Sequence, residues 1–150
     1  MIGIGDKAPE FDLPVAGGKR ASAALLRGRR YALYFYPKAD TSGCTVQAQG
    51  VQENLAALDK AGITVIGVSP DQVKKLEAFA KKFGLTFALA SDADQSLATA
   101  YDAWVEKSMY GRKYMGMERS TFLVSADGTV EAIWRKVKPA EHAGLLLAAG

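Results

Sequence analysis

The sequence contains one cysteine, Cys44, and one histidine, His142, so few of its residues are suited to nucleophilic or redox chemistry. Cys44 follows a loop of turn-forming residues (38–43) and opens a proline-free stretch in which apolar residues recur at helical spacing. The thiol is therefore expected at the start of a helix, where unpaired N–H groups and the helix dipole stabilise an anion. Because the thiolate is the nucleophilic form, this position favours a reactive cysteine, although a lone cysteine is more often buried and inert.

The residues around Cys44 favour the reactive alternative. The segment reads Pro37-Lys-Ala-Asp-Thr41-Ser-Gly-Cys44 and follows an aromatic run at 31–36. This Pro-x-x-x-Thr-x-x-Cys pattern resembles the active-site signature of the peroxiredoxins. Residues 34–38 and 43–47 resemble in particular the bacterioferritin comigratory protein branch, also called the Q type. Further segments that resemble this branch, in the same order and at similar spacing, are 91–92, 106–111 and 118–124.

The resemblance implies a thiol-dependent peroxidase that reduces hydrogen peroxide and organic hydroperoxides to water and alcohols. Cys44 would be the peroxidatic nucleophile and would become a sulfenic acid. The hydroxyl of Thr41 would approach the sulfur and the peroxide, or would satisfy only local backbone groups. Pro37 would shield the sulfur from water. Arg119 would favour the thiolate and hold the peroxide oxygens through its permanent charge, unless it is an ordinary surface arginine.

Gln47 lies one helical turn beyond Cys44, where many family members have Glu. It could orient Arg119 by hydrogen bonding, or it could be an ordinary helix residue.

The family often has a second, resolving cysteine at one of two positions, which here are Gln49 and Ala80. An external thiol (thioredoxin, glutaredoxin or a small thiol) must then resolve the sulfenic acid. The alternative is that a cysteine was replaced to trap an intermediate, for which Ala80 is the better candidate.

Other functions fit the sequence less well. A disulfide reductase normally uses a Cys-x-x-Cys pair, but Gln47 occupies the second position. A Cys–His protease would need His142, which lies in no matching motif and is expected on the solvated side of a C-terminal helix. One Cys and one His cannot supply a four-ligand zinc site, so we expect no metal and no cofactor. The remaining alternative is a redox-sensing or holdase-like protein without efficient turnover.

The composition is that of a soluble globular protein, and we expect residues 1–150 to form a single domain. Charged residues make up 23% and the net charge is +3, but basic and acidic residues are interspersed, which argues against nucleic-acid binding. No apolar run reaches the roughly 20 residues of a membrane span, and residues 1–14 lack a secretory pattern. We therefore expect a cytoplasmic monomer whose partners are a hydroperoxide and an external thiol reductant.

The apolar runs and turn residues predict the order β-α-β-α-β-α-β-β-α. Strands are expected at 31–36, 63–68, 86–90, 120–125 and 129–134, and helices at 44–62, 71–83, 94–104 and from 139 onwards. The early alternation predicts parallel strands with helical crossovers, and Asp127-Gly128 predicts a closing hairpin. The expected fold class is α/β: a thioredoxin-like (peroxiredoxin) fold with a central mixed β-sheet flanked by helices on both faces.

Overall fold

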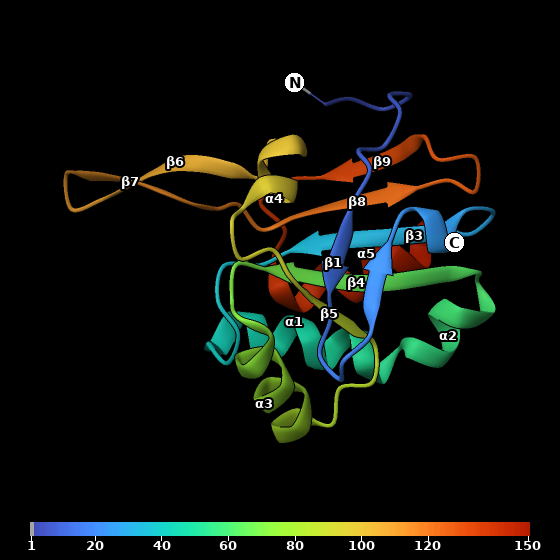
Figure 1. The fold of residues 1–150 in the computed structure, drawn as a ribbon, viewed down its shortest axis with the longest axis horizontal. Coiled ribbons are helices and arrows are strands. Elements are labelled where there is room, and N and C mark those ends of the chain that lie inside the picture. Colours follow the sequence, from blue (N-terminus) through green and yellow to red (C-terminus); the bar gives the residue numbers. More distant parts are fainter. Residues whose placement is uncertain (1) are drawn as a thin grey trace.

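A five-stranded sheet lies at the centre of the computed structural model, which describes residues 2–150 (Figure 1). The strands follow one another across the sheet in the order β5-β4-β3-β8-β9. Three of them are parallel: β3 (Arg30–Phe35), β4 (Ile63–Ser69) and β5 (Ala88–Ser91). The other two, β8 (Ser120–Val124) and β9 (Val130–Trp134), join this group in antiparallel fashion. The mixed sheet that the sequence predicts is therefore present.

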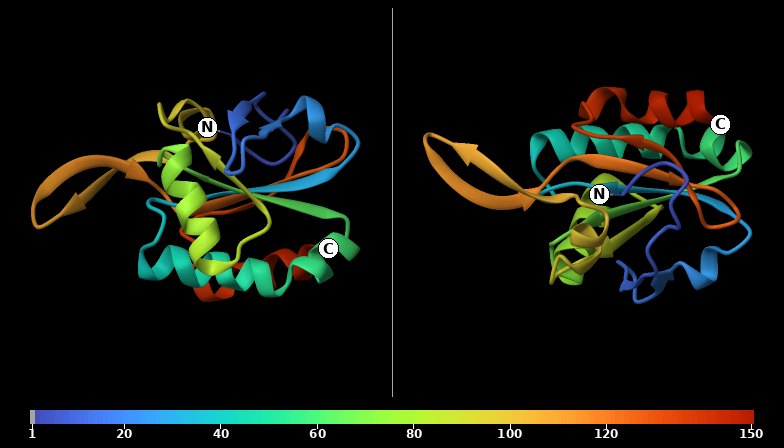
Figure 2. Two further views of the ribbon diagram at one scale, coloured as in Figure 1. Left: turned by 60° about the horizontal axis from the view of Figure 1, so that its bottom comes forward. Right: turned by 90° about the horizontal axis from the view of Figure 1, so that it is seen from above.

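Helices pack on both faces of this sheet. One face carries α1 (Ser42–Glu53), α2 (Leu55–Lys60), α3 (Val73–Phe83) and α5 (His142–Ala149), which follows a 3₁₀ turn at Pro139–Glu141. The other face carries α4 (Ser96–Ala100) and an N-terminal hairpin of β1 (Asp12–Pro14) and β2 (Arg20–Ser22) (Figure 2). Within residues 2–150, none of the helices combines the length and the apolarity that a membrane crossing needs.

Alternation along β3 gives each face its own core. Leu33 and Phe35 point to the α4 side, whereas Ala32 and Tyr34 point to the side that also holds Cys44. All four side chains are at most 1% exposed. Because the side chains of a strand alternate between its two faces, β3 connects the two cores and places the chain that follows it at the edge of the helical layer.

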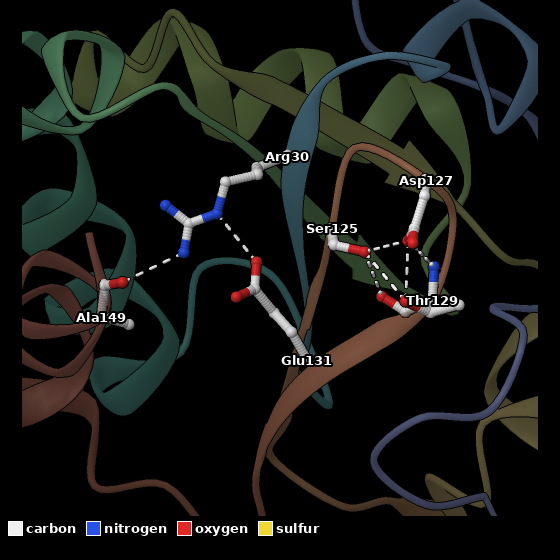
Figure 3. A network of polar contacts seen from close by, with 6 residues as sticks. All are labelled: Arg30, Ser125, Asp127, Thr129, Glu131 and Ala149. Carbon is white, nitrogen blue, oxygen red and sulfur yellow. Dashed lines mark hydrogen bonds and ion pairs between the residues drawn. The ribbon is translucent and has the colours of Figure 1, made fainter.

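A charged network at the amino end of β3 fixes the end of α5 (Figure 3). Arg30 donates to the Glu131 carboxylate of β9 at 2.8 Å and to the Ala149 carbonyl oxygen of α5 at 3.0 Å. A cation in this position also interacts favourably with the C-terminal end of the helix dipole. In the same view, hydrogen bonds close the predicted β8–β9 turn between Ser125, Asp127 and Thr129.

Two expected helices have different limits in the structure. The helix expected at 44–62 is divided at Asn54. Its side chain donates to the Gly50 carbonyl oxygen at 2.8 Å, and its backbone N–H donates to the Val51 carbonyl oxygen at 3.1 Å. The helix expected at 94–104 contains only α4, because Trp104 already belongs to a strand. In the first turn of α4, the N–H groups of Leu97 and Ala98 donate to the buried carboxylate of Asp92, at 3.1 and 2.8 Å.

The sequence reasoning missed a projecting hairpin of β6 (Trp104–Met109) and β7 (Arg112–Met117), which we call the β6–β7 arm (Figures 1 and 2). Its turn residues, Tyr110 and Gly111, have φ values of 52° and 76°, the left-handed pair that two-residue hairpin turns use. Most of its side chains are exposed, so the apolar alternation of a half-buried strand is absent. Two paired strands whose side chains are mostly exposed lack the hydrophobic alternation by which a sequence predicts a strand.

Candidate active site

Cys44 lies in the first turn of α1, just beyond the carboxyl end of β3. Pro37 follows the strand, the loop turns through Asp40 at a φ of 61°, and Thr41 is the extended residue that precedes the helix. The loop is held by a hydrogen bond from the Ala39 N–H to Asp71 at 2.7 Å. Cys44 is only 1% exposed, and it has the helix-start position that the sequence predicts.

Arg119 reaches the thiol from a segment 75 residues further along the chain. Its Nη2 donates to the Sγ atom of Cys44 at 3.4 Å, and its Nη1 donates to the Oε1 atom of Gln47 at 2.6 Å. A Cβ atom on Gly43 would lie 3.3 Å from Nη2, so the missing side chain leaves room for the guanidinium. The expected contact between Gln47 and Arg119 is thus present, and the permanently charged guanidinium of Arg119 is in hydrogen-bond contact with the Cys44 sulfur.

Gln47 is completely buried, which limits what else its amide can do. Its Oε1 atom accepts from Arg119, while its Nε2 atom has no hydrogen-bond partner within residues 2–150. The side chain therefore acts on the guanidinium through a single acceptor and adds no negative charge near the sulfur.

Thr41 and Pro37 belong to the loop that leads from β3 to α1. Thr41 is exposed and Pro37 is half-buried. The Thr41 hydroxyl donates to the Lys38 carbonyl oxygen at 2.8 Å. This bond to a local backbone group is one of the two roles that the sequence left open for Thr41. Because that bond uses the hydroxyl hydrogen, the lone pairs of the oxygen remain able to accept from a peroxide O–H.

Comparison with known proteins identifies the family. Residues 4–133 match the AhpC/TSA family. Peroxiredoxin Bcp of Escherichia coli K12 is 43% identical over 143 residues, which cover 95% of this chain and 92% of that protein. Peroxiredoxin Bcp of Xanthomonas campestris is 45% identical over 144 residues, with 95% of this chain and 90% of that protein covered.

Solved structures agree. The Xanthomonas campestris bacterioferritin comigratory protein, from work on its alkyl peroxide reduction activity, matches with a TM-score of 0.88 at 43% identity over 93% of this chain and 88% of that one. A mutant of Xylella fastidiosa PrxQ matches with a TM-score of 0.93 at 34% identity over 99% and 95%. The chain belongs to the peroxiredoxins. It is a thiol-dependent peroxidase of the Bcp/PrxQ type with a thioredoxin-like fold, and Cys44 and Arg119 lie together at its peroxidatic site.

The two positions at which a peroxiredoxin of this type could have a resolving cysteine lie on different helices. Gln49 is exposed on α1. Ala80 is half-buried on α3 and packs against the same core cluster that contains Cys44. Of the two, Ala80 therefore lies on the element that shares a core with the thiol.

The expectation of a solvated His142 is wrong. The side chain is 1% exposed, its Nε2 atom is hydrogen-bonded to the Thr121 hydroxyl at 2.8 Å, and its ring packs against Tyr34 at 4.9 Å between centroids. Burial and the positive charge of Arg119 lower the pKa of His142 to about 4. Burial also raises the pKa of Tyr34 well above its ordinary value, as do the neighbouring Tyr36 and Cys44. This peroxiredoxin thus has uncharged polar groups behind its active site.

Proposed function

We propose that this peroxiredoxin reduces alkyl hydroperoxides and hydrogen peroxide with Cys44, and that an external thiol completes the cycle. The observation that carries the proposal is the 3.4 Å contact between Arg119 and the Cys44 sulfur, with the guanidinium held in place by Gln47. Alkyl hydroperoxides as substrates are supported by the alkyl peroxide reduction activity named for the Xanthomonas campestris relative.

The chemistry is a displacement on oxygen. The thiolate of Cys44 attacks the O–H oxygen of the hydroperoxide, an S–O bond forms, and the O–O bond breaks with its electron pair on the leaving oxygen. The products are a sulfenic acid and an alkoxide, which takes up a proton from solvent and leaves as an alcohol. Negative charge moves from sulfur to the leaving oxygen, so a fixed cation beside both atoms stabilises the transition state. Arg119 is the cation in this position.

The remaining site residues support this step in different ways. In the proposal, Gln47 aims the guanidinium of Arg119, and Thr41 accepts a hydrogen bond from the incoming peroxide through its free lone pairs. Pro37 has no N–H to offer and covers the solvent side of the sulfur. A site closed in this way keeps bulk water from competing with the oriented groups.

The sulfenic acid needs a thiol from outside the chain, because Cys44 is the sole cysteine in the sequence. That thiol attacks the sulfenic sulfur to form a mixed disulfide and water, and a second thiol then releases Cys44. The proposed partners are therefore a hydroperoxide and a thioredoxin, a glutaredoxin or a small thiol, as a reducing cytoplasm would supply. We take the active unit to be a monomer with residues 1–150 as one domain, which the shared central sheet supports.

Peroxide consumption with each thiol donor tests this function, with cumene hydroperoxide and hydrogen peroxide as substrates. We expect catalytic turnover, and after one equivalent of peroxide without thiol a gain of one oxygen that dimedone traps. Arg119→Ala should slow the oxidation of Cys44 by about 100-fold or more, the usual effect of losing a preorganised donor. Cys44→Ser serves as the inactive control. Unoxidised Cys44 in the presence of persisting peroxide would refute the peroxidase cycle, and wild-type rates in Arg119→Ala would refute the role of the arginine.

A further inference from the structure

Lys107 of the β6–β7 arm reaches back to the segment that holds Arg119. It pairs with Tyr114 across the arm, but its side chain runs along the arm toward the body, and its Nζ atom donates to the Met117 carbonyl oxygen. Met117 is 1% exposed and lies two residues before Arg119. Lys107, a half-buried residue on a mostly exposed hairpin, therefore directs its ammonium group to one backbone carbonyl near the active site.

Gly116 makes this path available. A Cβ atom at this position would lie 3.1 Å from Cδ and 3.4 Å from Cε of Lys107. The lysine stem thus crosses the arm directly over the glycine. Since 3.1 Å is shorter than ordinary carbon contacts, any larger residue at position 116 would push the stem aside.

The carbonyl that Lys107 binds belongs to a segment with further backbone hydrogen bonds. The N–H of Glu118 donates to the Ala103 carbonyl oxygen at 2.7 Å, and the carbonyl oxygen of Arg119 accepts from the Val137 N–H at 2.8 Å. The Met117 carbonyl and the Glu118 N–H belong to the same peptide group, so the three bonds orient two peptide groups, the one before Glu118 and the one after Arg119. The guanidinium of Arg119 must extend from this segment to the Cys44 sulfur, so a small rotation of the segment would be enough to separate the two groups.

The electrostatic surroundings of Lys107 agree with its place beside the Arg119 segment. Burial and the nearby Arg119 lower the pKa of Lys107, whereas Glu118 and Cys44 act in the opposite direction. The ammonium group thus lies close to the arginine as well as on the Met117 carbonyl oxygen.

We propose that Lys107 is a positioning residue for the peroxidase reaction, because its bond to the Met117 carbonyl holds Arg119 on the Cys44 sulfur. The β6–β7 arm is then a part of the active-site framework, since it supplies the lysine and the glycine that the lysine crosses. This inference rests on the proposed role of Arg119.

Lys107→Met tests the proposal, because methionine retains an apolar stem and removes the ammonium group. The readouts are the second-order rate constant for Cys44 oxidation by peroxide and the melting temperature. We expect about a tenfold slower oxidation, since small misplacements of catalytic groups have effects up to about 100-fold. Lys107→Arg, which keeps a cation able to donate to the Met117 carbonyl, should recover most of the lost rate.

Lys113→Met is the matched control. Lys113 lies on the same arm and pairs with the carboxylate of Glu106 at 3.6 Å, and its side chain is 77% exposed. Its replacement removes the same charge without touching the Met117 carbonyl, so the oxidation rate should stay within about twofold of wild type, as for an exposed pair. Equal oxidation rates of Lys107→Met and Lys113→Met would overturn the proposal. A lower melting temperature with an unchanged oxidation rate would also overturn it, because Lys107 would then only stabilise the arm.

Gly116→Ala provides an independent route to the same answer and keeps every charge. Gly116→Ala should slow Cys44 oxidation in the wild-type background. It should have no further effect in the Lys107→Met background, because both changes disrupt the same contact, that of Lys107 with the Met117 carbonyl. If Lys107→Met does not fold, unchanged kinetics in Gly116→Ala overturn the proposal. Arg119→Ala separates the role of the arginine from that of the lysine. If Arg119→Ala retains the wild-type rate, the proposed role of Arg119 fails and the inference about Lys107 fails with it; if only Lys107→Met retains the wild-type rate, the inference about the lysine fails alone.

Discussion

His142 should make the stability of this peroxiredoxin depend on pH in a narrow acidic range. In the folded chain its Nε2 atom bonds to Thr121, and its Nδ1 atom has no partner within residues 2–150. A protonated ring carries an N–H on both nitrogens, and its Nδ1–H would have no acceptor. Protonation would also add a positive charge near Arg119. These are the reasons why burial, followed by the charge of Arg119, lowers the pKa of His142 from 6.5 to about 4.

Proton uptake on unfolding decides whether acid stabilises or destabilises the folded chain. Between pH 6.5 and pH 4 the unfolded chain binds a proton at His142 and the folded chain does not, so acid favours unfolding in this range. One pKa unit corresponds to about 1.4 kcal/mol, so the drop from 6.5 to about 4 is worth about 3 kcal/mol. This loss is absent above pH 6.5 and complete below pH 4. It is a large fraction of the 5–15 kcal/mol that is typical of a folded domain.

His142→Gln isolates this contribution, because glutamine can keep a polar contact with Thr121 but does not titrate in this range. Urea denaturation of both proteins should show their difference in unfolding free energy falling by about 3 kcal/mol from pH 7 to pH 4. The carboxylates common to both proteins cancel in that difference. Since His142 is the only histidine, its ring proton signal in NMR also gives the titration directly. A midpoint near 6.5, or a difference that does not change with pH, would refute the reasoning.

Three further perturbations have defined outcomes. Gln47→Leu removes the acceptor for Arg119 and should slow Cys44 oxidation about tenfold or more, as loss of a hydrogen bond to a charged group implies; an unchanged stopped-flow rate would contradict this. Gly67→Ala places a methyl group 2.9 Å from the Tyr34 ring and should lower the unfolding free energy in urea by about 1–3 kcal/mol, whereas the control Gly144→Ala has open space and should not. Ala80→Cys should replace the dimedone adduct by an intramolecular disulfide, if α3 unwinds enough to bring the Cα atoms within about 7 Å; mass spectrometry distinguishes the two products.

The sequence predicts the parts of this structure that have a strong local pattern. The apolar runs of β3 and β4 and the hairpin signal at Asp127-Gly128 mark the sheet, and its mixed topology follows from their order. The motif ending at Cys44 predicts the first turn of α1 together with its nucleophile. These features depend on residues close together in the chain, so the sequence alone predicts them.

The features that were missed depend on tertiary contacts. The β6–β7 arm has two mostly exposed faces, so it lacks the apolar alternation that marks a strand. His142 opens α5, whose residues are almost all apolar, and such a helix has no polar side from which the direction of the histidine could be inferred. The division of the first helix depends on a single side-chain bond from Asn54 to Gly50.

Glycines inside regular elements would have been the best sequence signal for the packing of the site. Gly43 in α1 and Gly116 in β7 are not turn residues, and both lie where a charged side chain crosses the backbone closely: Arg119 over the first and Lys107 over the second. A glycine weakens a helix or strand, and at these two positions that cost accompanies a close approach by another side chain, unlike at Gly144 of α5, which faces open space. The space at Gly43 admits the guanidinium that contacts Cys44, and the space at Gly116 admits the lysine that binds the segment from which this guanidinium extends. The position of the cation at the thiol therefore depends on two missing side chains as well as on Arg119 itself.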